Sequence, residues 1–164
     1  MPAVPPPEDL PSEAQLKELY LQNAPEPVRR YWTRPRPLEL RPVDLRHYVS
    51  REPLEPAQQI WIRSSEPLPD DPDIHRCVLA YASDMTLLDT ALFAHGRAIF
   101  DPVLQAASLD HAVWFHRPSD LTRWHLYVQE SPSASGARGY NRASIFSQDG
   151  VLVASATQEA LMRW

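Results

Sequence analysis

The chain has 164 residues, of which 43% are hydrophobic, and this is enough for one globular domain with its own core. Its formal net charge is −5 and no basic patch is evident, so nucleic acid is not an expected partner. The sequence has neither a long apolar run nor a signal-peptide pattern, so no membrane association is expected. The single cysteine, Cys77, cannot form an internal disulfide and is expected in the core. We therefore expect a reducing compartment, the cytoplasm.

Residues 1–31 are predicted to be a proline-rich linker with a short helix. Fifteen of the eighteen prolines lie in residues 1–72, and the acidic stretch from Met1 to Pro11 is typical of an extended arm. A short helix is predicted for Ser12 to Asn23, because Ser12 begins an S-E-A-Q capping signature. A further helical turn is expected over residues 28–32. Residues 38–44 and 59–63 are predicted strands.

A long helix is predicted from about Pro72 to about His95, with Asp71 as its cap and Gly96 as its end. At about 100° per residue, Asp84 lies beside the apolar stripe of this helix, where a carboxylate is costly unless it is paired. Position alone is compatible with an ion pair at the core edge or with a catalytic role. The stripe recurs at three- and four-residue steps: Ile74, Val78, Tyr81, Met85, Leu88 and Leu92.

Four strands are predicted after the helix, over residues 107–116, 124–129, 139–147 and 151–163, and residues 148–150 form a tight hairpin between the last two. Ser108 stands near the start of the first of them. In the last strand, Gln158 is the one hydrogen-bonding side chain in an otherwise apolar row. Such an amide either satisfies neighbouring backbone groups or does chemistry. The apolar members of that row are Leu152, Ala154, Ala156, Ala160 and Met162.

No metal-spaced Cys/His cluster, glycine-rich phosphate loop or G-x-S-x-G motif occurs, so neither a metal nor a cofactor is expected. Asp110 and His111 resemble an acid–base dyad. However, adjacent residues of a strand point to opposite faces, so we do not expect these two side chains to meet. Surface or packing roles are expected for the scattered histidines His75, His95, His111, His116 and His125.

Two strands, one long helix and four strands predict an α+β domain, a curved antiparallel sheet wrapped around one long central helix, which is the hotdog fold. The sequence resembles the second half of the type II (TesB-like) acyl-CoA thioesterases, the double-hotdog family. The resemblance rests on the order and spacing of six segments: Arg36–Pro42 (RPLELRP), Gln59–Arg63 (QIWIR), Leu79–Asp84 (LAYASD), Leu109–His116 (LDHAVWFH), Ser133–Gly139 (SASGARG) and Gln148–Ser155 (QDGVLVAS).

This resemblance implies a hotdog thioesterase-like domain over residues 32–164 and an enzyme of lipid metabolism that hydrolyses fatty acyl-CoA to a free fatty acid and coenzyme A. Matched by position, the catalytic residues are Asp84, Ser108 and Gln158, with Ser108 standing where many relatives have Thr. In the implied mechanism Asp84 is the general base for an attacking water, and the other two residues orient that water.

The resemblance covers the C-terminal half of the family. A lone half leaves a sheet edge unpaired, so we expect a homodimer or pairing with an N-terminal hotdog domain. Two other functions stay open. One is a non-catalytic acyl-binding or subunit-pairing half that needs an N-terminal hotdog for activity. The other is a hydratase or dehydratase, which requires a histidine beside an acid.

Overall fold

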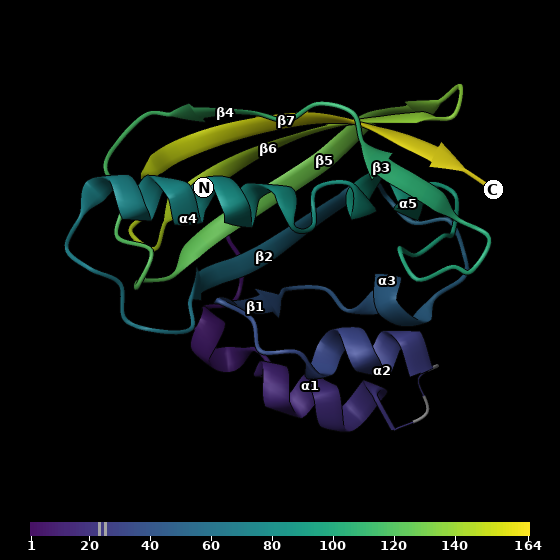
Figure 1. Cartoon of the computed structure of the whole chain (residues 1–164), viewed down its shortest axis with the longest axis horizontal. Helices are drawn as coiled ribbons and strands as arrows, with labels where there is room; N and C mark the ends of the chain where they lie inside the picture. Colours follow the sequence, from purple (N-terminus) through teal and green to yellow (C-terminus); the bar gives the residue numbers. More distant parts are fainter. Residues whose placement is uncertain (23, 25) are drawn as a thin grey trace.

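A computed structural model describes residues 1–22, 24 and 26–164 of the chain (Figure 1). The described strands form one antiparallel sheet in the order β1-β2-β5-β6-β7-β3, and β4 also pairs with β7. The strands are β1 (Leu38–Pro42), β2 (Ala57–Ser64), β3 (Gln105–Ser108), β4 (Ala112–Phe115), β5 (His125–Ser135), β6 (Arg138–Ser147) and β7 (Leu152–Arg163). The helices are η1 (Pro7–Asp9), α1 (Glu13–Tyr20), α2 (Glu26–Thr33), α3 (Arg46–Val49), α4 (Pro72–Asp84) and α5 (Asp89–Phe93).

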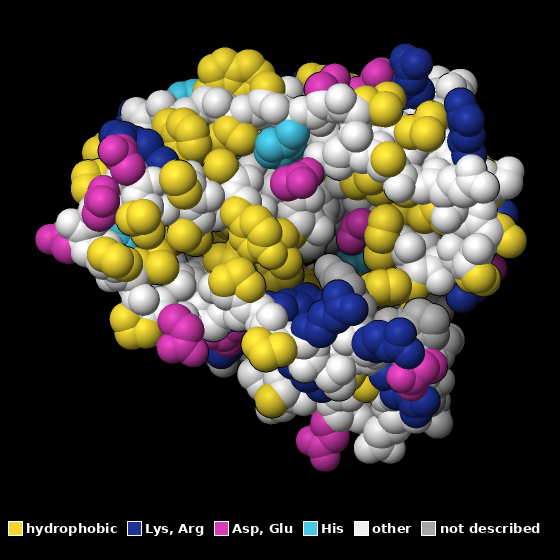
Figure 2. Space-filling model, in the orientation of Figure 1, with side chains coloured by type: hydrophobic (Ala, Val, Ile, Leu, Met, Phe, Trp, Pro, Cys, Tyr) yellow, Lys and Arg dark blue, Asp and Glu magenta, His cyan; other side chains and the backbone are white. Residues whose placement is uncertain are grey.

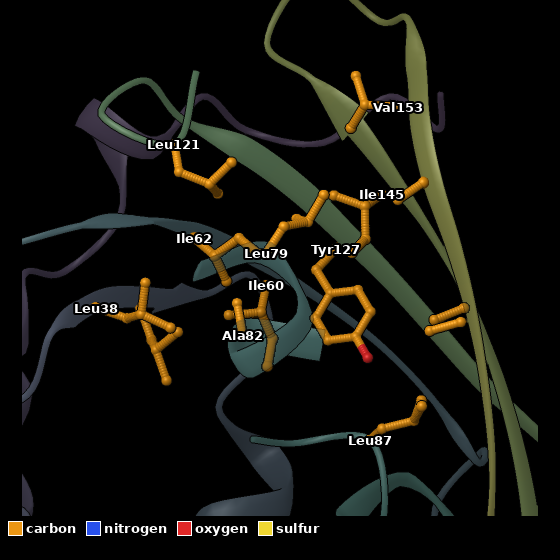
Figure 3. Packing of buried hydrophobic residues seen from close by; sticks show 14 residues of the cluster. Leu38, Ile60, Ile62, Leu79, Ala82, Leu87, Leu121, Tyr127, Ile145 and Val153 are labelled. Atoms are coloured by element: carbon orange, nitrogen blue, oxygen red, sulfur yellow. The ribbon is translucent and has the colours of Figure 1, made fainter. Parts of the chain in front are cut away.

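The predicted α+β hotdog fold is confirmed. Figure 1 shows the sheet curving around α4, with α1 and α2 grouped beyond β1. The core lies between α4 and the concave face of the sheet. Figure 3 shows Tyr127 and Ile145 of the sheet in one cluster with Leu79 of α4, and each of these three side chains is at most 1% exposed. None of the described helices is long and apolar enough to cross a membrane.

The predicted helix over residues 72–95 is wrong in its length, because α4 ends at Asp84 and α5 begins only at Asp89. Side chains from the sheet account for the break. The Tyr127 hydroxyl donates to the carbonyl oxygen of Ser83 (2.5 Å), and Gln58 Nε2 donates to that of Thr86 (3.1 Å). In a continuous helix these carbonyls would accept from backbone N–H groups four residues later.

The predicted buried stripe is confirmed for four residues and wrong for two. Val78 and Met85 pack against the main core cluster, and Leu88 and Leu92 belong to a second cluster. The sheet buries His75, Leu79, Ala82 and Ser83, whereas Ile74 and Tyr81 of the predicted stripe are 38% and 53% exposed. Cys77, expected in the core, is exposed as well. Both sides of α4 carry apolar residues, so periodicity alone does not tell which side meets the sheet. A partly apolar outer face therefore remains uncovered.

The predicted strand over residues 107–116 is split into β3 and β4. Ser108 pairs with Ala160 and Ala112 pairs with Thr157, so the three residues 109–111 face only two residues of β7. An extra residue in one of two paired strands is a β-bulge. The Glu159 carbonyl accepts from the Leu109 N–H (2.9 Å), and the Asp110 carboxylate accepts from the Glu159 N–H (2.8 Å). These contacts replace regular ladder bonds across the bulge.

The remaining predicted elements are confirmed, with shifted ends. Ser12 forms the expected capping box at the start of α1, and the predicted end of that helix at Asn23 lies outside the described residues. Gly150 has φ +85° in the hairpin between β6 and β7. The proline-rich arm lies against the sheet, since Pro5 and Pro7 accept hydrogen bonds from Trp61 and Arg41. The division into residues 1–31 and 32–164 stays a prediction.

Gly139 of β6 allows the sheet to approach α5 closely. A Cβ atom at this position would lie 2.4 Å from the Cβ of Ala91 in α5 and 2.9 Å from Met162 Cε. We expect Gly139→Ala to lower the free energy of unfolding by about 1–3 kcal/mol through overpacking. Urea unfolding measures this change. The control is Gly139→Ala combined with Ala91→Gly, which restores room and should cost less than the sum of the single changes. Additive costs would contradict the close contact.

Candidate active site

The three predicted site residues lie together on the concave side of the sheet. Asp84 is the last residue of α4, Ser108 the last of β3, and Gln158 lies within β7. Gln158 Nε2 donates to Asp84 Oδ1 and to Ser108 Oγ, the latter over 3.0 Å. One amide nitrogen therefore connects a helix end and a strand end that are far apart in sequence.

The orientation of the Gln158 amide follows from its neighbours. An ionised carboxylate only accepts hydrogen bonds, so the NH₂ group must face Asp84. The opposite atom, Gln158 Oε1, is then buried with no hydrogen-bond partner among the described residues. A buried unpaired acceptor costs about 1–3 kcal/mol, so stability alone does not favour glutamine here. Such local violations are typical of functional positions.

Asp84 is less buried than its sequence position indicated, since its side chain is 53% exposed. Its carboxylate faces solvent on one side and Gln158 on the other. Beneath it, Tyr127 is fully buried. Burial first, and then the negative charge of Asp84, raise the pKa of Tyr127 well above its ordinary value. Tyr127 therefore stays a neutral donor to the Ser83 carbonyl.

A buried polar cluster fixes the segment that follows Asp84. Gln58 Nε2 donates to Thr90 Oγ1 (3.0 Å) and Gln129 Oε1 (3.1 Å), and Gln129 Nε2 donates to Thr86 Oγ1 (2.8 Å). Gln58, Gln129 and Thr90 are all at most 4% exposed. These bonds join β2 and β5 to residues 86–90, so the break after α4 has one defined conformation.

His111 is a site residue that the sequence interpretation missed. Its Nε2 lies 2.8 Å from Ser83 Oγ, and its Nδ1 lies 3.4 Å from Gln158 Nε2 and 3.9 Å from Asp84 Oδ1. The sequence interpretation grouped His111 with the scattered histidines. In a regular strand His111 would point to the face opposite Ser108, and the bulge across residues 109–111 brings both side chains to one site. Asp110 and His111 do have different partners, as expected, but the imidazole turns toward Asp84. The weak signal was an Asp-His pair close after Ser108 in the same predicted strand.

The described residues contain no group of three or more His, Cys, Asp or Glu side chains that could hold a metal ion. A separate apolar cavity of about 330 Å³ lies between the N-terminal helices, α3 and α5, with Leu16, Tyr20, Phe93 and Phe100 in its wall. Two titratable residues, His47 and Asp89, also line this cavity. Burial lowers the pKa of His47 to about 4 and raises the pKa of Asp89 to about 7.

Comparisons with known proteins find a family whose members resemble this chain. A family model described as "Acyl-CoA thioesterase" matches residues 32–161. An "Acyl-CoA thioesterase 2" from Haemophilus influenzae is 38% identical over all of this chain and 57% of its own length. The crystal structure of an acyl-CoA thioesterase II from Mycobacterium marinum is 41% identical with a TM-score of 0.74, over 100% of this chain and 56% of that one.

A protein with a hotdog fold from Alicyclobacillus acidocaldarius aligns with a TM-score of 0.68 at 23% identity, which supports the fold alone. It too is matched over all of this chain and only 55% of its own. The chain thus spans about half the length of the relatives it matches.

Asp89 makes the stability of the fold depend on pH. Its folded pKa of about 7 exceeds its ordinary value of 3.8, so folding takes up a proton between these values. The stabilisation is complete below about pH 4 and is lost as the pH rises through 7. We therefore compare the unfolding free energies of Asp89→Asn and the parent chain at two pH values. We expect the difference to shift by about 2–4 kcal/mol in favour of the variant when the pH rises from 5 to 8. Urea unfolding at both values tests this, and a constant difference would contradict it.

Proposed function

The chain belongs to the acyl-CoA thioesterase family, and on that premise we propose that it hydrolyses fatty acyl-CoA thioesters to a free fatty acid and coenzyme A. The observation that supports this most is the contact of Asp84, Ser108 and Gln158 through one amide nitrogen. These three residues have the chemistry that a water-mediated thioester hydrolysis needs, and they come from three separate elements. We propose the cytoplasm as its compartment.

In the proposed mechanism Asp84 accepts a proton from a water molecule that attacks the thioester carbonyl carbon. Gln158 Nε2 donates to Asp84 and to Ser108 Oγ, so the hydroxyl hydrogen of Ser108 is free to point at the water or at the carboxylate. Holding base and water in this way replaces a bimolecular encounter with an oriented one. The C–S bond then breaks and coenzyme A leaves as a thiolate, so no covalent enzyme intermediate is required.

A second hotdog unit is the proposed partner of this chain. In the part of the chain that the structure describes, β4 pairs only with β7 and is otherwise an edge. Exposed apolar side chains occur on α4 and in the 109–115 segment, and we name them together the α4–β4 surface: Ile74, Cys77, Tyr81, Leu109, Trp114 and Phe115. Figure 2 shows hydrophobic side chains gathered over α4. An edge of this kind is rarely left bare.

The span of about half of each relative's length fits the same proposal, since a second hotdog could be another copy of this chain or an N-terminal domain. Because the chain spans about half of each relative, the alternative function is a non-catalytic acyl-binding or subunit-pairing half. The retained Asp84, Ser108 and Gln158 contacts favour hydrolysis over it, because a binding module has no use for an oriented carboxylate.

Thiol release from a short and a long acyl-CoA by the purified chain tests the activity. We expect Asp84→Asn to lower kcat by about 10²–10⁴-fold, since it removes the general base while preserving shape. Asp73→Asn, an exposed carboxylate in the first turn of α4, is the matched control and should keep full activity. Equal rates for parent and Asp84→Asn would reject the assignment of the base. An enoyl absorbance change without thiol release would indicate a hydratase instead.

Light scattering at micromolar concentration tests the proposed pairing of two copies. We expect the mass of a dimer for the parent chain and a shift toward the monomer for Trp114→Glu, which places a charge on the exposed edge strand. Tyr140→Glu is a matched control, because Tyr140 is 39% exposed on β6, away from the edge. A monodisperse parent monomer would mean that the α4–β4 surface is covered by a different chain segment or not at all.

A further inference from the structure

The His111 ring is a fourth polar group of the candidate active site, and its surroundings define which ring nitrogen carries hydrogen. The Ser83 hydroxyl donates to the carbonyl oxygen of Ala80 (2.8 Å) and is fully buried. A serine hydroxyl has one hydrogen, so Ser83 Oγ can only accept from His111 Nε2, which lies 2.8 Å away. The neutral ring therefore carries its hydrogen on Nε2, and Nδ1 has a free lone pair.

That lone pair is directed into the site. Nδ1 lies 3.4 Å from Gln158 Nε2 and 3.9 Å from Asp84 Oδ1, and the His111 side chain is only 20% exposed. Both amide hydrogens of Gln158 are already directed at Asp84 and Ser108, so Nδ1 keeps its capacity to accept. Catalytic contacts are often longer in a free enzyme and shorten when substrate binds.

The other acidic groups next to His111 are engaged elsewhere. Asp110 accepts from the backbone N–H of Glu159, and the Glu159 carboxylate pairs with Arg138 over 3.4 Å. Asp84 is therefore the carboxylate that faces Nδ1 among these neighbours.

We propose that His111 is the proton acceptor for Asp84 during thioester hydrolysis, with Ser83 as the residue that positions it. This inference rests on the proposed function. The water oxygen bonds to the carbonyl carbon while one of its O–H bonds breaks, and that proton goes to the Asp84 carboxylate. The proton then moves on to His111 Nδ1, the ring acceptor that faces this carboxylate over 3.9 Å. The C–S bond then breaks, the sulfur leaves with the electron pair, and the Nδ1 proton neutralises this thiolate.

This transfer frees Asp84 in its charged form for the next water, and it keeps the leaving group from re-attacking the new acid. Both side chains return to their starting charge at the end of the cycle. Ser83 Oγ accepts the hydrogen bond from Nε2–H and so favours the tautomer with a free Nδ1. A neutral ring with its hydrogen on Nδ1 could not accept the proton from Asp84 at that atom. The bulge at residues 109–111 is what turns the ring to this side of the strand.

The pH dependence of thiol release tests the proposal. We expect the parent rate to fall toward acidic pH, because a ring that already carries a proton on Nδ1 cannot accept another. His111→Asn should lower kcat by about 10–100-fold, leave KM nearly unchanged and lack that acid limb. His116→Asn is the control, because the His116 ring bonds to Ser155 (2.9 Å) and should leave rate and profile unchanged. A parent-like rate and acid limb in His111→Asn would overturn the proposal.

A second measurement does not need turnover. Long-range proton–nitrogen NMR spectra of the chain labelled with ¹⁵N-histidine identify the neutral tautomer of His111. We expect hydrogen on Nε2 in the parent and a mixture of tautomers in Ser83→Ala. Hydrogen on Nδ1 in the parent would overturn the proposal even if the chain hydrolyses thioesters. If the chain releases no thiol, the proposed function is rejected. The tautomer is measured independently of turnover, so it still decides whether His111 Nδ1 can accept a proton.

Discussion

Two hydrogen bonds from the sheet to the carbonyls of Ser83 and Thr86 determine where α4 ends, and the candidate site depends on that ending. Tyr127 donates to the Ser83 carbonyl and Gln58 to the Thr86 carbonyl. If the helix continued, Asp84 would lie within a regular turn beside the core. Because it ends there, the Asp84 carboxylate is free to reach Gln158 on β7. The negative end of the helix dipole disfavours a carboxylate at this position, and the amide hydrogen of Gln158 offsets part of that cost.

The β-bulge between β3 and β4 is the second feature that positions side chains of the candidate site. Without the extra residue, Ser108 and His111 would point to opposite faces of the strand. With it, Ser108 approaches Gln158 Nε2, and His111 approaches Ser83 and Asp84. Val113, which follows the bulge in β4, still packs against the main core cluster. A local irregularity thus brings two polar groups to one carboxylate while the sheet keeps its apolar face.

Sequence patterns predicted the order of elements, the hairpin and the meeting of Asp84, Ser108 and Gln158, the last through family resemblance. They did not predict the end of α4, because its cause lies in Tyr127 and Gln58, which are distant in sequence. They also missed His111, which was grouped with the scattered histidines, because its approach to Asp84 depends on a bulge held by bonds between Asp110, Leu109 and Glu159. Ile74 and Tyr81 were wrongly placed in the buried stripe because both sides of α4 carry apolar residues. The helix end and the position of His111 both depend on tertiary contacts, which a local pattern does not contain.

The exposure of Asp84 and the exposure of the α4–β4 surface have a common origin. The sheet covers only the side of α4 that carries Leu79 and Ala82, so the opposite side and the last residue of the helix both meet solvent. Apolar burial stabilises association by about 25 cal/mol per Å² before its costs, so the exposed Tyr81 and Trp114 favour a partner at this place. A second hotdog seated there would also reduce the water around Asp84 and strengthen its hydrogen bonds. In the proposed enzyme, pairing and catalysis therefore share one helix, because the face that binds the partner ends at the general base.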